Sequence, residues 1–235
     1  MGCGTLYLIP VPLGPVNPDT CLPPDTLAVT RRLNHFVVER AKTARAHLKA
    51  MGHPQPIQAL QIEELNEHTP AAAIPPLLAP LKAGQDVGLL SEAGCPAVAD
   101  PGAALVMAAH HANIPVVPLI GPSSILLALM ASGLGGQRFS FHGYLPTKEP
   151  ERSQKIRALE ITARRDRATQ LFIETPYRSS ALLDALAATL SPNTFISVGA
   201  DLSLPSQLIQ TRSAKNWRGQ TDAVKDRLVV FGIGI

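Results

Sequence analysis

The sequence has no long hydrophobic run and few cysteines. None of its apolar stretches approaches the roughly 20 residues that a membrane-spanning helix needs. The amino-terminal MGCGTLYLIP has no basic region ahead of its apolar part, unlike a secretory signal. Three cysteines (Cys3, Cys21 and Cys95) form an odd and scattered set, which favours a reducing compartment over a disulfide framework. We therefore expect a cytoplasmic protein with no membrane partner.

Aromatic residues are also scarce, at 4% of the chain. This leaves few platforms for stacking unpaired bases over a large surface. Neither sign of charge dominates, and the formal net charge is only +3. Such a mild excess of basic residues permits a nucleic-acid partner without requiring one.

Three familiar chemical motifs are missing. The seven histidines are dispersed, and none is spaced from Cys or a carboxylate as in a known ligand set, so we expect no metal. There is no Walker-type GKS/T, which argues against nucleotide phosphate transfer. There is no GxSxG, and no histidine lies near Cys95 in sequence, so a nucleophilic hydrolase has little support.

What the chain does have is a regular alternation of short apolar runs and helical segments, punctuated by 22 prolines. In the first part, the runs typical of buried strands are 5–9, 35–38, 57–62, 87–90 and 116–119. Helical segments separate them, which predicts a mostly parallel sheet covered on both faces. The apolar helix over 125–131 is too short to span a membrane, so we expect it to be buried.

The pattern changes after Gly133. Leu134-Gly135-Gly136-Gln137 resembles a flexible joint, and later strand candidates follow one another with few helices between them. We therefore predict two α/β domains. Residues 1–134 would form an amino-terminal domain with a mostly parallel sheet, and residues 135–235 a carboxy-terminal domain with a mixed sheet.

Loops of small residues follow the strands at 87–90 and 116–119. SEAGCPAVADPG comes after the first, with Asp100 as an expected helix N-cap and Pro101 at the first helical position. Gly121 and Pro122 come after the second and lead into a helix. Turns at the carboxyl ends of parallel strands are where open α/β sheets bind ligands. We therefore expect a small organic ligand to be held there, largely by backbone groups.

Five motifs in this order carry a resemblance to a known family: TLYLIPVPLG, SEAGCPAVADPG, VVPLIGPSS, SGL…RFSFHGYLP and FIETPYR. Together they span nearly the whole chain and resemble the tetrapyrrole-methylase-like class of S-adenosylmethionine-dependent methyltransferases. Within that class, the chain looks most like the enzymes that methylate a ribose 2′-hydroxyl of small-subunit ribosomal RNA. The resemblance implies a homodimer of two-domain chains, with S-adenosylmethionine held in the cleft between the domains and RNA as the partner.

Carried across by motif, the cofactor-lining residues fall in three segments. They are Pro12, Leu13 and Gly14, then Ser91, Glu92, Ala93, Gly94 and Pro96, and finally Ser123 and Ser124. Glu92 stands where the family usually has aspartate, so its longer side chain would move the contact. A solvated loop carboxylate is the alternative for Glu92, and helix capping is the alternative for each serine.

The acceptor side departs from the family pattern. An acidic-threonine-arginine signature is replaced by Glu39-Arg40-Ala41-Lys42, and a histidine of those enzymes is Leu65 here. Glu39 and Glu67 are the candidates for a base that accepts the proton of a ribose hydroxyl. The alternative for both is a surface carboxylate or a salt bridge to Arg40.

Basic residues on and beside the helix predicted from Glu151 could meet phosphates, although a solvated helix face is the commoner explanation for such residues. Two other functions remain open from the sequence. One is a methylase of the same class that acts on a small tetrapyrrole-type molecule. The other is a non-catalytic RNA-binding relative that keeps the fold without the chemistry.

Overall fold

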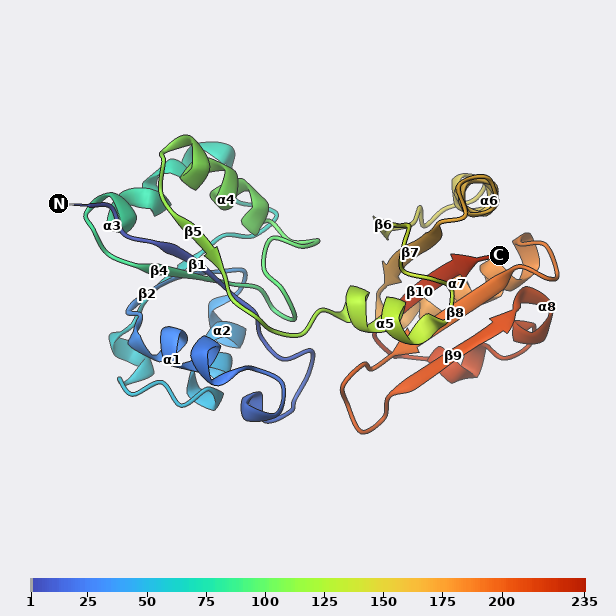
Figure 1. Cartoon of the computed structure of the whole chain (residues 1–235), viewed down its shortest axis with the longest axis horizontal. Helices are drawn as coiled ribbons and strands as arrows, with labels where there is room; N and C mark the ends of the chain where they lie inside the picture. The colour runs from blue at the N-terminus through green and yellow to red at the C-terminus, as the bar shows by residue number, and fades with distance from the viewer. Residues whose placement is uncertain (1) are drawn as a thin grey trace. The chain divides into compact units, whose positions relative to one another are not determined.

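In the computed structural model, which describes residues 2–235, the chain divides into two α/β units (Figure 1). The first ends at Ser123 and the second runs from Ser124 to Ile235. The sequence placed this division later, after Leu134. It comes earlier because helix α5 (Ser124–Ser132) packs on strands β8, β9 and β10 of the second unit.

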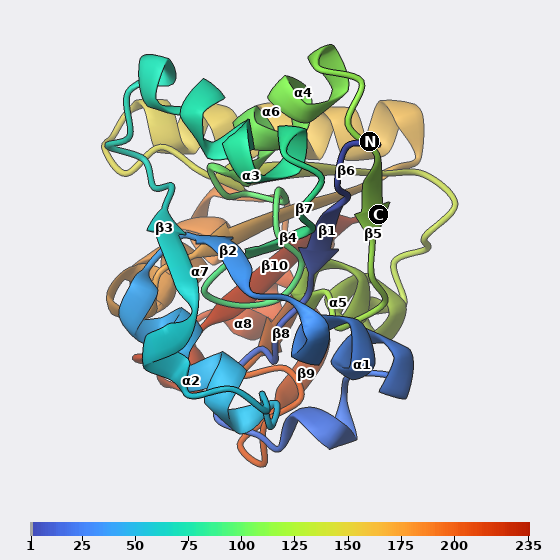
Figure 2. The same ribbon diagram turned by 90° about the vertical axis from the view of Figure 1, so that its left-hand side faces the viewer.

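The first unit contains a wholly parallel sheet in the strand order β3-β2-β4-β1-β5, which is the order across the sheet in Figure 2. Its strands are β1 (Leu6–Ile9), β2 (His35–Val38), β3 (Gln61–Glu64), β4 (Val87–Leu90) and β5 (Val116–Pro118). The central strand β4 is buried throughout and pairs with β1 and β2. A strand that is buried on both faces needs apolar or small side chains at every position, which Val87-Gly88-Leu89-Leu90 provides.

Apolar side chains cover both faces of this sheet. Phe36 and Val38 point into a core with helices α1 (Pro24–Arg32) and α2 (Ala41–Ala50). Val37, between them in sequence, belongs to the core on the other face, with α3 (Ala79–Lys82) and α4 (Gly102–His111). This is the period-2 alternation of a strand between two helical layers. The mostly parallel, doubly covered sheet predicted for this part is confirmed.

The expected strand over 57–62 is wrong in its first half. Ile57–Ala59 is a turn of 3₁₀ helix, and the strand begins at Gln61. Pro56 starts this turn, and Pro75 and Pro76 likewise keep the segment before α3 in short 3₁₀ turns. These turns are Ala71–Ala73 and Pro75–Leu78, and a further one lies at Pro18–Thr20. Proline fixes φ and removes a backbone donor, so closely spaced prolines favour short turns over regular elements.

The second unit contains a mixed sheet in the order β6-β7-β10-β8-β9. β6 and β7 run parallel, whereas β10 is antiparallel to β7 and β8, and β9 is antiparallel to β8. The strands are β6 (Phe139–Tyr144), β7 (Thr169–Glu174), β8 (Phe195–Ala200), β9 (Leu208–Ser213) and β10 (Val229–Gly234). The mixed sheet predicted from the run of late strand candidates is confirmed.

Helices cover both faces of this second sheet. α6 (Glu151–Asp166), α7 (Pro176–Thr189) and α8 (Ala214–Trp217) share a core with Phe172 and Phe231, whose rings stack at 5.8 Å. A 3₁₀ turn, Thr221–Val224, packs against α7. On the other face, Gly199 leaves room for α5, because a Cβ there would lie 3.3 Å from that of Ala128.

The expectation that 125–131 is wholly buried is wrong. Ala128 and Leu129 are buried, but Leu126 is 51% exposed and Met130 is 79% exposed. α5 packs with one side on the second sheet, and its other side stays exposed although its sequence is apolar. Within residues 2–235, no helix combines the length and the apolar content needed to cross a membrane.

Candidate functional site

Parallel strands bring the turns that follow them to one edge of the first sheet. Here these are the turn from Pro10 to Gly14 after β1, Glu39 and Arg40 after β2, and the loop from Ser91 after β4. The segment from Leu119 to Pro122 follows β5. We call this edge, with these four turns, the acidic rim, for the carboxylates described below.

The turns after β1 and β4 are hydrogen-bonded to each other. The N–H of Val11 donates to the carbonyl of Gly94 at 2.9 Å, and the N–H of Gly94 donates to the carbonyl of Val11 at 3.1 Å. Gly94 has φ of +69°, a conformation that favours glycine, and a Cβ there would lie 3.2 Å from Leu13 Cδ2. Two of the segments predicted to line a cofactor therefore meet in space.

The turn after β5 reaches the same place. The Cys95 thiol donates to the carbonyl of Pro122 at 3.4 Å. A Cβ on Gly121 would lie 2.4 Å from Pro10 Cβ, so only glycine allows the turns after β1 and β5 to approach so closely. Ser123 follows directly, and the boundary between the units falls between Ser123 and Ser124, so Ser124 begins α5 in the second unit. Backbone convergence in the first unit thus matches the expectation from sequence, while cofactor contact by these residues stays a prediction.

Asp100 holds the far end of the loop after β4. Its Oδ1 accepts the N–H groups of Ala97 at 2.8 Å and Gly102 at 2.7 Å, so it caps α4 although Pro101 is the residue before the helix. Ala97 and Ala99 have φ of 65° and 60°, a left-handed conformation that costs non-glycine residues energy. The other carboxylate oxygen, Oδ2, is buried without a hydrogen-bond partner among the described residues. Burial raises the pKa of Asp100 above its usual range.

Glu92 is an anchored residue rather than a freely solvated loop carboxylate. Its Oε1 accepts the hydroxyl of Thr43 at 2.8 Å and lies 3.5 Å from Arg40 Nε. Its backbone carbonyl lies 3.1 Å from His47 Nε2. Thr43 and His47 are four residues apart on α2 and so share one face of that helix. The side chain of Glu92 thus ties the loop to α2, a connection between residues far apart in the chain that no local sequence pattern signals.

Glu39 lies half-buried directly after β2. Its Oε2 accepts the backbone N–H of Glu92 at 3.3 Å. Burial raises the pKa of Glu39, and the negative charges of Glu92 and Asp100 raise it further. A carboxylate with a raised pKa is a stronger base than an ordinary surface glutamate. The ion pair of Arg40 is with Glu92.

Glu67, the other candidate base, lies at the surface. Its side chain is 84% exposed and lies 3.7 Å from His68. Leu65, which replaces a family histidine, is buried in the core below and donates its N–H to Val38 at 2.8 Å. Ala41 donates its N–H to Glu64 at 2.7 Å. The environment of Glu39 therefore suits proton transfer better than that of Glu67.

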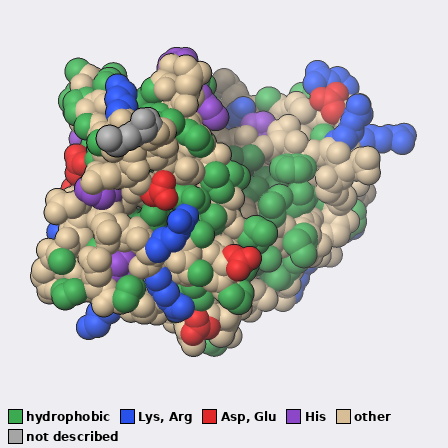
Figure 3. Space-filling view, turned by 60° about the vertical axis from the view of Figure 1, so that its left-hand side comes forward, with side chains coloured by type: hydrophobic (Ala, Val, Ile, Leu, Met, Phe, Trp, Pro, Cys, Tyr) green, Lys and Arg blue, Asp and Glu red, His purple; other side chains and the backbone are tan. Residues whose placement is uncertain are grey.

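Several of the basic residues on α6 are paired with acidic neighbours. Arg165 makes two hydrogen bonds of 2.7 Å to Asp166, and Arg164 lies 3.9 Å from Glu160. On the face shown in Figure 3, basic side chains lie beside acidic ones rather than in one continuous basic area. In the described part of the chain, no three His, Cys, Asp or Glu side chains are grouped so that they could hold a metal ion.

Curated relatives of this chain include proteins that carry the name "Ribosomal RNA small subunit methyltransferase I". The protein from Micromonospora olivasterospora is 38% identical over 189 residues, which cover 80% of this chain and 56% of the relative. The protein from Mesorhizobium japonicum is 33% identical over 228 residues, which cover 96% of this chain and 74% of the relative. The chain thus spans only about half of the first relative and three quarters of the second.

Solved structures share the fold. The crystal structure of the methyltransferase CobJ matches with a TM-score of 0.65 and 21% identity, covering 100% of this chain and 94% of that one. The cobalamin biosynthetic enzyme cobalt precorrin-4 methyltransferase matches with a TM-score of 0.61 and 13% identity, covering 98% and 94%. A family model described as "Tetrapyrrole (Corrin/Porphyrin) Methylases" matches residues 7–216. This match covers most of the chain, and the parallel sheet and the converging turns agree with it. The chain therefore belongs to the tetrapyrrole (corrin/porphyrin) methylases, a family of S-adenosylmethionine-dependent methyltransferases.

Proposed function

We propose that this chain transfers the methyl group of S-adenosylmethionine to RNA, at a ribose 2′-hydroxyl of the small ribosomal subunit. The observation that carries the proposal is the meeting of three backbone turns at Gly94 beside the carboxylates of the acidic rim. The RNA acceptor is supported by the shared name of the curated relatives.

The residues at the acidic rim fit the cofactor chemically. S-adenosylmethionine carries a sulfonium and an ammonium against one carboxylate, so it has an excess of positive charge. The rim offers the carboxylates of Glu39 and Glu92 and the buried, unpartnered oxygen of Asp100. The glycines Gly14 and Gly94, with Ala93 beside them, let a ligand approach the backbone of the turns from Pro12 and from Ser91 closely. We propose that these segments, with Ser91, Pro96, Ser123 and Ser124, line the cofactor.

The bound cofactor would supply an electrophilic methyl group on sulfur. The protein must orient the acceptor, exclude water and take up the hydroxyl proton as the new C–O bond forms and the C–S bond breaks. We propose Glu39 for the last task, because its raised pKa makes its carboxylate a stronger base. Glu67 remains the weaker candidate, since its exposed carboxylate keeps its hydration.

The acceptor can be tested directly. Total RNA from a strain that lacks this protein is incubated with purified protein and tritiated-methyl S-adenosylmethionine, and the labelled nucleotide is mapped. We expect the label in small-subunit ribosomal RNA. Ribonuclease should release this label, and no label should be incorporated when the RNA is digested beforehand. A parallel incubation replaces the RNA with a tetrapyrrole such as a uroporphyrinogen. Label there, with none in RNA, would instead support the small-molecule alternative. Failure to bind S-adenosylmethionine at concentrations up to about a millimolar would support a non-catalytic relative. A dissociation constant of that size corresponds to a binding free energy of roughly 4 kcal/mol.

The same proposal includes a cytoplasmic homodimer. The free thiols of Cys3, Cys21 and Cys95 are consistent with a reducing compartment. The exposed apolar side chains of Leu126 and Met130 on α5 are consistent with a subunit contact. Light scattering on the purified protein tests the dimer, and a monomer at all concentrations would contradict it.

A further inference from the structure

The second sheet has its own edge at which the ends of parallel strands meet. β6 ends at Tyr144 and β7 at Glu174, and because these strands run parallel, the segments that follow them leave the sheet at the same edge. Tyr144 is 55% exposed, and Tyr177, at the start of α7, is 75% exposed. The chain contains only three tyrosines, and two of them are exposed in these segments.

Arg178 is fixed in place at this edge. Its Nε and Nη2 donate to Oε1 of Glu174 at 2.9 and 2.6 Å, and Glu174 is buried. The same oxygen accepts the backbone N–H and the hydroxyl of Thr175. The guanidinium carbon lies 5.2 Å from the centre of the Tyr177 ring. Hydrogen bonding to Glu174 raises the pKa of Arg178. These bonds use Nε and Nη2 and do not use the N–H donors of Nη1.

The same arrangement recurs after β6. Nε and Nη2 of Arg152, in the first turn of α6, lie 2.9 and 2.8 Å from Oε1 of Glu149. Lys148 precedes this pair and is exposed. Two arginines, each held by a glutamate, thus follow the ends of the two parallel strands. A guanidinium held in one orientation loses less side-chain entropy when it binds a phosphate.

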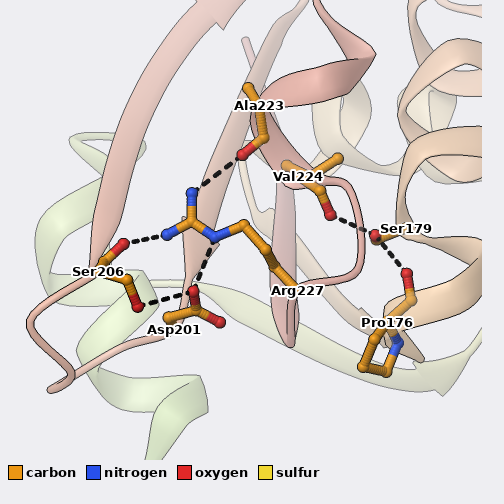
Figure 4. A network of polar contacts seen from close by, with 7 residues as sticks. All are labelled: Pro176, Ser179, Asp201, Ser206, Ala223, Val224 and Arg227. Atoms are coloured by element: carbon orange, nitrogen blue, oxygen red, sulfur yellow. Dashed lines mark hydrogen bonds and ion pairs between the residues drawn. The ribbon is translucent and has the colours of Figure 1, made fainter.

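Arg227 offers a contrast, because three parts of the protein hold its guanidinium at once. Its Nε donates to Asp201 at 2.7 Å, its Nη1 to the carbonyl of Ala223 at 3.0 Å, and its Nη2 to the carbonyl of Ser206 (Figure 4). All three nitrogens of Arg227 are occupied by the protein. Arg178 differs, because its bonds to Glu174 use only Nε and Nη2.

We propose that the segments after β6 and β7 form a binding site for single-stranded RNA, in which Tyr144 and Tyr177 stack on unpaired bases and Arg178 contacts a phosphate. We call this site, with Arg152 and Lys148, the aromatic-basic edge. Exposed aromatic rings beside arginines are what unpaired nucleotides require, because every base has a stacking face and every linkage carries a negative charge. A duplex hides its base faces and gives the tyrosines nothing to stack on. This inference rests on the proposed function, since it assigns residues to the RNA acceptor.

The test measures binding of a fluorescein-labelled single-stranded oligoribonucleotide by anisotropy. Tyr177→Ala should weaken binding about tenfold, whereas Tyr177→Phe keeps the ring and should not weaken it. Arg178→Lys should weaken binding because lysine lacks the planar pair of N–H donors of a guanidinium. Matched controls on the same unit are Phe195→Ala and Arg165→Ala. Phe195 is 43% exposed at the opposite end of the sheet, and Arg165 lies in the last turn of α6. The controls should bind like the unaltered protein, and S-adenosylmethionine binding by calorimetry should be unchanged in all variants.

Equal affinity of Tyr177→Ala and the unaltered protein would overturn the inference, as would equal losses in Tyr177→Ala and Phe195→Ala. So would a parallel loss of S-adenosylmethionine binding, which would assign the tyrosine to the cofactor, or a failure of the unaltered protein to bind the oligonucleotide. If the protein binds RNA through Tyr177 but labels none, the proposed function fails and this inference stands. If it labels RNA and Tyr177→Ala does so with unchanged KM, the inference alone fails.

Discussion

The acidic rim of the first sheet and the aromatic-basic edge of the second are built on the same topological feature and carry opposite chemistry. At the rim, turns rich in glycine, proline and alanine approach closely and are joined by backbone hydrogen bonds. The charged groups there are Glu39, Glu92 and Asp100. At the edge, the backbone is less prominent and the exposed groups are tyrosines beside anchored arginines.

The difference shows how strand direction limits what a sheet can gather. In the first unit every strand is parallel to its neighbours, so the turn after each strand reaches one edge and several backbone segments meet at Gly94. In the second unit β6 and β7 are parallel while the other pairings are antiparallel, so fewer such segments come together. The groups available to a ligand at that edge are therefore mainly side chains. The carboxylates of the first arrangement suit a small cationic ligand, and the arginines of the second suit an anionic chain.

The largest effect that would sharpen this contrast is expected from Glu39→Gln. Removing the base should lower kcat for RNA methylation by about 100-fold or more, without weakening RNA binding at the other unit. In the unaltered protein, activity should fall as the pH drops through the raised pKa of Glu39, because the protonated carboxyl cannot accept a proton. Rate profiles against pH check this, and Glu67→Gln is the matched control.

The same variant has an expected effect on stability with a defined sign. Because folding raises the pKa of Glu39, its charge destabilises the fold at neutral pH, and this cost vanishes when both folded and unfolded states are protonated. Glu39→Gln should therefore be no less stable at neutral pH, with a difference that shrinks as the pH falls. A large loss of stability in thermal denaturation would show that Glu39 serves the fold instead.

A second variant separates the two sites through the backbone. In Gly121→Ala the new Cβ would lie 2.4 Å from Pro10 Cβ, so the turns after β1 and β5 must move apart. We expect a cost of about 1–3 kcal/mol in the free energy of unfolding. S-adenosylmethionine affinity should fall by about tenfold, which is roughly 1.4 kcal/mol, while binding of single-stranded RNA persists. Calorimetry and denaturant unfolding measure both quantities.

Gly136→Ala is the control for that change, since its new Cβ meets Leu129 at an ordinary 3.6 Å. If both glycine variants bind the cofactor like the unaltered protein, the converging turns do not form its site, and the contrast between the two edges loses its functional meaning.

A third pair of variants tests how the loop after β4 is held. Asp100→Ala removes the acceptor of the Ala97 and Gly102 N–H groups and should cost about 2 kcal/mol. Asp100→Asn keeps that oxygen and should stay closer to the unaltered protein. Urea unfolding compares the two, and equal losses would mean that the charge, rather than the capping oxygen, holds the loop.

The smallest expected effect comes from Thr43→Val, which removes the hydroxyl bonded to Glu92 at a similar side-chain volume. We expect a loss of about 1 kcal/mol in the free energy of unfolding, with little change in RNA binding at the other unit. Unfolding measured by circular dichroism checks it. An unaltered stability would show that Glu92 holds the loop through Arg40 and its own backbone.

Much of the fold follows from local pattern. Val87 to Leu90 and Val116 onward are apolar runs between turn residues, and they are strands within one residue of the prediction. The segment from Ile57 to Ala59 was expected as part of a strand, but it follows Pro56 and forms a 3₁₀ turn. Proline fixes φ and so favours the turn there. The sequence places the boundary between the units after Leu134, whereas the structure divides the chain after Ser123, because α5 packs on the second sheet and composition does not report packing.

The sequence by itself determined that strands and helices alternate, that small residues follow the strands, and that the motifs are those of this family. Local preference and spacing are sufficient for each of these. Only the tertiary structure decided that Val11, Gly94 and Pro122 meet, that Glu92 reaches Thr43, and that Glu39 is half-buried while Glu67 is exposed. Proximity, burial and pKa depend on groups far apart in the chain, and their positions are fixed only when the sheet assembles.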